Sequence, residues 1–149
     1  MCAHGWDDIF DIAMAGTANG SHVWFDPIGL HVPVGTTIRW TNRDAGNAHT
    51  ATAYERRIPV GSPGWDSDYL LPGETFAVRL TEPGVYDYFC RPHELAGMAG
   101  RIVVGAGRSL PYDDAALPAA VLGLLPSVEE IVARARVALP NAAVGLAHH

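Results

Sequence analysis

The chain has 149 residues, 48% of them hydrophobic, and a formal net charge of -6 at pH 7. This length and apolar content suffice for one domain with a buried core. All ten basic residues are arginine and they form no basic stripe, which argues against a nucleic-acid binder, and no run of 18 or more apolar residues predicts a transmembrane segment.

The first half of the chain predicts short strands separated by turns. The clearest strand covers residues 36–42, where polar and apolar residues alternate and place Ile38 and Trp40 on a buried face. A strand over residues 23–34 is interrupted at Asp26-Pro27, because proline cannot donate to a strand ladder. The remaining predicted segments are strands over 7–14 and 50–55, a turn over 16–21 that contains Asn19-Gly20-Ser21, and a long irregular segment over 56–71.

The next segments continue this pattern up to residue 104. Alternation over residues 75–80 predicts a strand, and Glu82-Pro83-Gly84 predicts a tight turn into a strand over residues 85–90. Tyr86, Tyr88 and Cys90 then share one face, so the residues between them point outward. Short strands with frequent turn signals favour an all-β sandwich over a parallel sheet.

The segment that carries chemistry is Cys90-Arg91-Pro92-His93-Glu94-Leu95-Ala96-Gly97-Met98, which has the pattern C-x2-H-x4-M. A thiol, an imidazole and a thioether on one short loop suit a single copper ion. A thiolate and two imidazoles in a plane, with a weak axial thioether, form the blue-copper site. The second imidazole should come from a neighbouring strand far upstream, and His49 fits that position.

These residue types also occur in other kinds of site. Taken singly, a cysteine on a strand is usually a small buried hydrophobe. Zinc also binds cysteine and two histidines, but it would not select a thioether such as Met98. A Cys/His nucleophilic dyad would need a third orienting group. The other histidines are scattered along the chain, and too few of them lie on predicted strands to bind the second, all-histidine copper ion of a nitrite reductase. His4, His22 and His31 are expected at surface or packing positions.

Residues 20–105 resemble the plastocyanin, pseudoazurin and halocyanin branch of the cupredoxins. The motifs Pro72-Gly73-Glu74-Thr75-Phe76 and Pro83-Gly84-Val85-Tyr86-Asp87-Tyr88-Phe89-Cys90 strengthen the likeness. The resemblance implies a Greek-key β-sandwich fold. It also implies that the protein is not an enzyme. It also implies one type 1 copper ion, whose ligands by position are His49, Cys90, His93 and Met98.

The resemblance assigns further roles near the metal. The backbone amide of Thr50 would donate to the Cys90 sulfur, and Tyr86 would tie down a turn through its hydroxyl. An exposed edge of His93, ringed by Pro92 and Leu95, would be the port for electrons. Phe89 stands where plant plastocyanins carry a tyrosine used in partner docking, so that side route is in doubt and an apolar cover over Phe89 is expected.

The resemblance stops after residue 107, which divides the chain into a copper-binding domain over 1–107 and a C-terminal extension over 108–149. A short helix is predicted within residues 113–123, starting or interrupted at Pro118. A capping box at Ser127-Val128-Glu129-Glu130 begins a second, amphipathic helix that Pro140 ends. Its apolar stripe, expected to pack on the domain or to serve in docking, consists of Val128, Ile131, Val132, Ala135 and Leu139.

Three functional classes follow from these predictions. The favoured one is a mobile one-electron carrier outside the cytoplasm, in the periplasm, whose partner is a c-type cytochrome or a membrane oxidoreductase. The second is a copper-binding protein for tolerance or delivery, and the third is an accessory subunit of a larger redox complex. Cys2 is either incidental or, if a signal peptide once preceded it, the site of a lipid anchor. The terminal pair His148-His149 is interpreted as a tag remnant.

Overall fold

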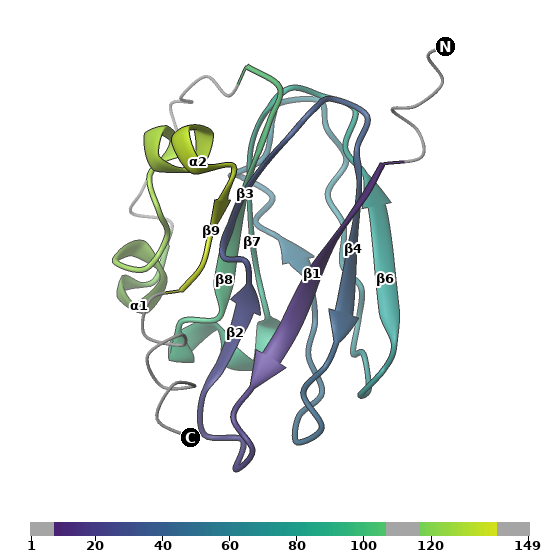
Figure 1. Ribbon diagram of the computed structural model, residues 1–149, viewed down its shortest axis with the longest axis vertical. Coiled ribbons are helices and arrows are strands. Elements are labelled where there is room, and N and C mark those ends of the chain that lie inside the picture. The colour runs from purple at the N-terminus through teal and green to yellow at the C-terminus, as the bar shows by residue number, and fades with distance from the viewer. Residues whose placement is uncertain (1–7, 107–116, 140–149) are drawn as a thin grey trace.

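The computed structural model describes residues 8–106 and 117–139. Two sheets face each other as a β-sandwich, with two short helices along one side (Figure 1). In chain order the elements are β1 (Ile9–Gly16), β2 (Val23–Asp26), β3 (Gly29–Val32), β4 (Thr37–Asn42), β5 (Thr52–Ala53), β6 (Thr75–Arg79), β7 (Gly84–Phe89), the 3-10 helix η2 (Arg91–Ala96), β8 (Ala99–Val104), α1 (Ala119–Leu122), α2 (Val128–Arg134) and β9 (Arg136–Val137). The predicted all-β sandwich is confirmed.

The two sheets are both mixed. One has the strand order β2-β1-β4-β6 and the other β5-β7-β8-β3-β9. Strands β1 and β4 run parallel, as do β3 and β8, while the other pairs are antiparallel. The predicted break at Asp26-Pro27 separates β2 from β3, which lie in different sheets. The strand expected over residues 50–55 is shorter than predicted, because only Thr52–Ala53 pairs with β7.

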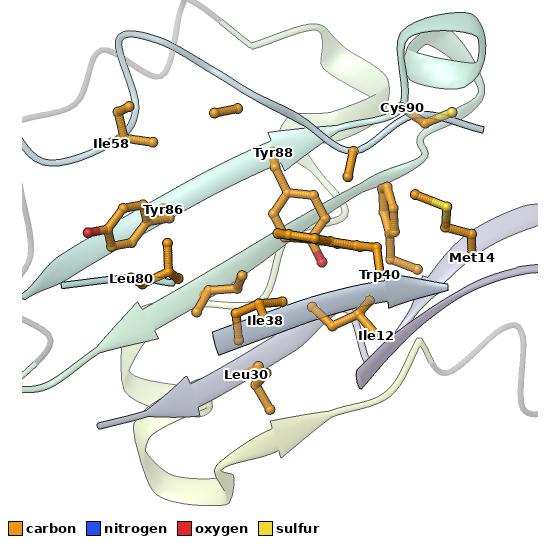
Figure 2. Close-up of a cluster of buried hydrophobic side chains, with 14 of the residues drawn as sticks. Ile12, Met14, Leu30, Ile38, Trp40, Ile58, Leu80, Tyr86, Tyr88 and Cys90 are labelled. Carbon is orange, nitrogen blue, oxygen red and sulfur yellow. The ribbon is translucent and has the colours of Figure 1, made fainter. Parts of the chain in front are cut away.

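The main core lies between the sheets. Ile38 and Trp40 are fully buried there, as their alternation in β4 predicted. Figure 2 shows Trp40 beside Tyr88 in the centre of this core, and Cys90 at the end reached by following β7 from Tyr86. Trp40 and Tyr88 meet edge to face, with ring centroids 5.2 Å apart. The core therefore ends at the thiol of Cys90.

The outward face of β7 is covered by other parts of the chain. Asp87 was predicted to point outward, and it is fully buried. Its carboxylate accepts hydrogen bonds from Arg57 at 2.8 Å and from Arg101 at 2.8 and 3.1 Å. Arg101 also donates to the Pro126 carbonyl in the extension. The alternation of side chains in β7 correctly predicted the direction of Asp87, but residues of a loop and of the extension cover that face of the strand.

An apolar cover over Phe89 is confirmed. The Phe89 ring stacks on Tyr54, with centroids 4.3 Å apart. Both rings pack against a small cluster to which the extension contributes Leu117 and Val121. This side of the sandwich is therefore closed by the segment that contains α1.

The described part of the extension packs on the second sheet. Helix α1 starts after Pro118, as predicted, and the Ser127 hydroxyl caps α2 by accepting a hydrogen bond from the Glu130 amide at 3.1 Å. Ile131 is fully buried in a second apolar cluster with Ile28 and with residues of β2, β7 and β8. The division of the chain at residue 107, and any docking role of the extension, remain predictions.

The expected end of the second helix is wrong. Helix α2 stops at Arg134, and Ala135 has a positive φ of 65°. The chain then turns into β9, which pairs antiparallel with β3. Val132, predicted in the buried stripe, is 41% exposed, and Leu139 is buried beyond β9 rather than on the helix. In the part of the chain that the structure describes, no helix has the length and apolar character needed to cross a membrane.

Candidate metal centre

Cys90 follows the last residue of β7 and is fully buried. Tyr86 and Tyr88, two and four residues earlier, are buried on the same face, as strand alternation requires. The Tyr86 hydroxyl donates to the Glu82 carbonyl at 2.7 Å and so ties down the turn before β7. The start of the strand that presents the thiol is therefore fixed.

His49 lies in the segment between β4 and β5. Its backbone forms an isolated antiparallel bridge with Leu70, with hydrogen bonds of 3.2 and 2.8 Å. The long segment after β5 therefore returns to hold His49 in place. The imidazole is fully buried, so its orientation is set by protein groups.

The segment after Cys90 forms a closed loop. The Cys90 amide donates to the Met98 carbonyl at 3.0 Å, the His93 amide to the Cys90 carbonyl at 3.1 Å, and the Met98 amide to the His93 carbonyl at 3.2 Å. Gly97 has φ 88°, in the left-handed region that glycine adopts readily. The loop thereby brings Met98 back beside Cys90, and the Met98 side chain is fully buried in the same cluster.

The structure places the predicted donors together. The Cys90 sulfur lies 3.5 Å from Nδ1 of His49 and 3.3 Å from Nδ1 of His93. The ligand atoms of these three residues are all within 4.8 Å of one another. A thiolate and two imidazole nitrogens, with a buried thioether nearby, match the donor set of a type 1 copper ion.

Burial favours the neutral forms of Cys90, His49 and His93 in the absence of a metal. Burial raises the pKa of the Cys90 thiol, and the Thr50 amide, which donates to the sulfur at 3.4 Å, opposes that effect. Burial also lowers the pKa of His49 and of His93, which favours neutral imidazoles with free lone pairs. A bound metal ion would stabilise the thiolate, because metal binding releases the thiol proton.

Two features around the loop were not predicted. The Thr50 hydroxyl accepts from the Arg91 amide at 2.8 Å, so its side chain holds the ligand loop while its amide bonds the sulfur. The Tyr54 hydroxyl donates to the Glu94 carboxylate at 2.6 Å. Neither contact carries a sequence signal, because each joins residues about forty positions apart.

A nucleophilic role for Cys90 has an orienting acid in the structure but lacks access to a substrate. Sequence reasoning found no third orienting group, but His49 Nε2 lies 2.8 Å from the Asp44 carboxylate. Cys90, His49 and Asp44 are therefore linked in the order of a catalytic triad. However, all three side chains are buried, and a nucleophile needs access to its substrate. The geometry favours a metal ligand set.

The remaining histidines do not join this group within the described residues. His22 is exposed, and His31 Nε2 lies 2.8 Å from the Gly105 carbonyl. These positions agree with the expected surface and packing roles. Cys2, His4 and the pair His148-His149 lie outside the described residues.

Comparison with known proteins adds an independent finding. Residues 12–105 match the family described as copper binding proteins, plastocyanin/azurin family. The chain is 42% identical to a chloroplastic plastocyanin from Hordeum vulgare over 91 residues, which cover 58% of each protein. It is 34% identical to a plastocyanin from Scenedesmus fuscus, over 63% of this chain and 99% of that protein. The chain thus spans under two thirds of the barley relative but nearly all of the algal one.

A solved structure agrees with these sequence matches. A pseudoazurin from Sinorhizobium superposes with a TM-score of 0.57 and 29% identity, over 67% of this chain and 76% of that protein. The family match covers residues 12–105 and so ends before the C-terminal segment. The elements α1, α2 and β9 therefore lie outside the matched family region.

Proposed function

Because the chain belongs to the plastocyanin/azurin family of copper-binding proteins, we propose that it is a one-electron carrier and not an enzyme. We assign one type 1 copper ion to His49, Cys90, His93 and Met98. The observation that carries the proposal is the convergence of one sulfur and two Nδ1 atoms at a buried point. Copper, when bound, supplies a couple between its cuprous and cupric states.

The residues around the site would keep its geometry constant during electron transfer. His49 is held by the bridge to Leu70, and the other three donors lie on one loop closed by its own backbone hydrogen bonds. Arg91, at the start of that loop, is further tied to Asp68 at 2.9 Å. Ligands that move little between the two oxidation states give a low reorganisation energy, and fast electron transfer requires a low reorganisation energy.

The port for electrons follows from differences in burial. His93 is half-buried, whereas the other three proposed ligands are fully buried. Leu95, two residues further on, is 81% exposed, and Pro92 is also exposed. The His93 edge is thus bordered by apolar surface on which a partner can dock. The alternative side, at Phe89, is covered by Tyr54 and the segment containing α1.

The partner we propose is another redox protein, a c-type cytochrome or a membrane oxidoreductase. We place the exchange outside the cytoplasm, in the periplasm, and a lipid anchor at Cys2 is part of the same hypothesis. The net charge of -6 favours a partner with a positively charged face. Arg91 does not oppose this, because Asp66 and Asp68 pair with it at 3.3 and 2.9 Å.

Delivery of copper as cargo is less well supported by the site. Three of its four proposed donors are fully buried, and three of the four lie on a loop that closes on itself, which favours retention of the metal over its release. An accessory role in a larger complex would use exposed surface of the extension, where Leu122 and Val132 are 46% and 41% exposed. Tight co-purification with a partner would favour that role over a mobile carrier.

Replacing Met98 with leucine should keep the colour of the copper-loaded protein and raise its reduction potential. The thioether is a weak axial donor that tunes the site, whereas the band depends on the thiolate. Each tenfold loss of cupric relative to cuprous affinity raises the potential by about 59 mV. Voltammetry with an absorption spectrum measures both properties. Loss of the band in Met98→Leu would mean that this side chain does more than tune the ion.

Replacing Leu95 with aspartate should slow electron exchange with a redox partner without bleaching the copper. Leu95 is 81% exposed and stands two residues after His93, so a charge there should disturb docking with little effect on the fold. The measurement is the bimolecular rate as a function of ionic strength. A steep fall with added salt indicates attraction through acidic surface, while a flat response indicates that apolar contact dominates.

A matched control is Val34→Asp. Val34 is 49% exposed and lies beside Gly105, at the opposite end of β8 from the ligand loop. The charge change is the same, so its rate should stay near that of the wild type. Equal rates for Leu95→Asp and wild type with every candidate partner would place the port elsewhere.

A further inference from the structure

The buried carboxylate of Asp44 contacts the proposed ligand His49 from the side opposite Cys90. Asp44 is 2% exposed and His49 is fully buried. The carboxylate Oδ2 lies 2.8 Å from His49 Nε2, while His49 Nδ1 lies 3.5 Å from the Cys90 sulfur. One imidazole nitrogen thus faces the acid and the other faces the metal position.

The carboxylate is held in place by its own loop. The Gly46 amide donates to Oδ1 at 3.0 Å, and the Asn47 side chain donates to Oδ2 at 3.0 Å. The Asp44 amide in turn donates to the Asn42 side chain at 2.8 Å. Both groups that share the acid with His49 are uncharged donors, so no guanidinium among these contacts neutralises it.

Strand β1 leaves room for this arrangement. A Cβ atom at Gly16 would overlap the carboxylate of Asp44, so glycine at the end of β1 makes space for the acid. The space, the loop hydrogen bonds and the imidazole all converge on one side chain. This convergence indicates a site built around the acid rather than a chance surface contact.

The hydrogen-bond chemistry fixes the tautomer. A carboxylate accepts hydrogen bonds and does not donate them when ionised. His49 must therefore carry its proton on Nε2 to satisfy the contact, which leaves the Nδ1 lone pair directed toward Cys90. Carboxylate partners of this kind orient ligating histidines and make them stronger donors, and their loss typically costs about 10- to 100-fold in metal affinity.

We propose that Asp44 is a positioning residue that sets the tautomer and orientation of His49 and lowers the reduction potential of the bound copper. The inference rests on the proposed function of the site. The added negative charge, acting through the imidazole in a buried environment, stabilises the cupric ion more than the cuprous ion, because the cupric ion carries the larger positive charge. The protein thereby acquires a lower potential than the four ligands alone would give it.

The test compares Asp44→Asn with the wild type. Asparagine keeps an acceptor for His49 Nε2 and removes the charge, so the visible band should remain. Cupric affinity should fall by roughly 10- to 100-fold with a smaller loss for cuprous ion, which corresponds to a potential raised by up to about 59–118 mV. Asp11→Asn removes the same charge from an exposed pair with Arg39, and its potential should equal that of the wild type.

A second measurement needs no variant and covers the case in which Asp44→Asn does not fold. Nitrogen-15 NMR of the reduced, copper-free wild type should show the neutral His49 imidazole with its proton on Nε2 and slow exchange of that proton. The copper-free form is used because copper on Nδ1 would by itself exclude a proton from that nitrogen. A proton on Nδ1 would overturn the inference. Equal potentials for Asp44→Asn and wild type, with both bands present, would overturn it while leaving the carrier function intact. A colourless copper-loaded wild type would overturn the function and this inference together.

Discussion

Replacing Cys90 with serine is expected to abolish the intense visible band of the copper-loaded protein. The band requires charge transfer from a thiolate, and a serine hydroxyl provides no such donor near neutral pH. The Cys90 sulfur is also the atom that lies close to both imidazoles, at 3.5 and 3.3 Å. We expect copper affinity to fall by more than the roughly 10- to 100-fold that loss of an outer partner costs. Absorption spectra recorded during copper titration measure both effects.

The matched control is Cys2→Ser, which removes the other cysteine of the chain and should leave the band intact. His49→Ala and His93→Ala should weaken the band by opening the site. An unchanged band in Cys90→Ser would show that the colour arises elsewhere. A wild type that stays colourless with copper and binds zinc in tetrahedral geometry would contradict the copper assignment.

Much of the site could be predicted because three of its residues are close in sequence. Cys90, His93 and Met98 occupy one loop, so their spacing alone restricts how they can meet. His49 was predicted from its place before a short strand and from the family resemblance. The structure brings it to the loop through the bridge with Leu70, a pairing that local sequence does not indicate.

Asp44 was not predicted, for a physical reason. Aspartate in a segment with asparagine and glycine is typical of a turn, and this sequence gives no sign of which way the carboxylate points. Its direction depends on space left by Gly16, 28 positions earlier on another strand. The nearest signal was an acid five residues before the proposed ligand, which is common enough to carry no weight alone.

The extension shows how a correct pattern can give a wrong boundary. Apolar residues at helical spacing predicted a helix as far as Pro140, but pairing of β9 with β3 ends α2 at Arg134. Residues such as Leu139 fit a helical stripe and a buried segment after a strand equally well. The choice depends on the edge of β3, which is far away in sequence. Different tertiary contacts, with Arg57 and Arg101, accompany the burial of Asp87, which strand alternation placed on the outside.

Replacing Ile131 with alanine should lower the free energy of unfolding by about 2–5 kcal/mol. The side chain is fully buried in the cluster where α2 packs against the sandwich. It lies over Gly29 of β3, where an added Cβ would come within 2.8 Å of the Ile131 Cγ1. The cavity left by truncation would therefore lie against a strand of the sandwich. Denaturant unfolding of the intact protein measures the change, and the visible spectrum should be nearly unaffected.

The matched control is Val132→Ala, one residue further along α2. Val132 is 41% exposed, so its truncation should change stability by about 0.5 kcal/mol or less. Gly29→Ala alone should also lower the stability of the protein, because the new methyl group would crowd Ile131 and Pro126. In combination with Ile131→Ala that methyl group would occupy part of the cavity, so the double variant should be more stable than the sum of the single changes predicts. Strict additivity would contradict the contact between Gly29 and Ile131, and an Ile131→Ala variant as stable as Val132→Ala would mean that α2 contributes little to the sandwich. In that case the extension would be better explained as a surface for a partner.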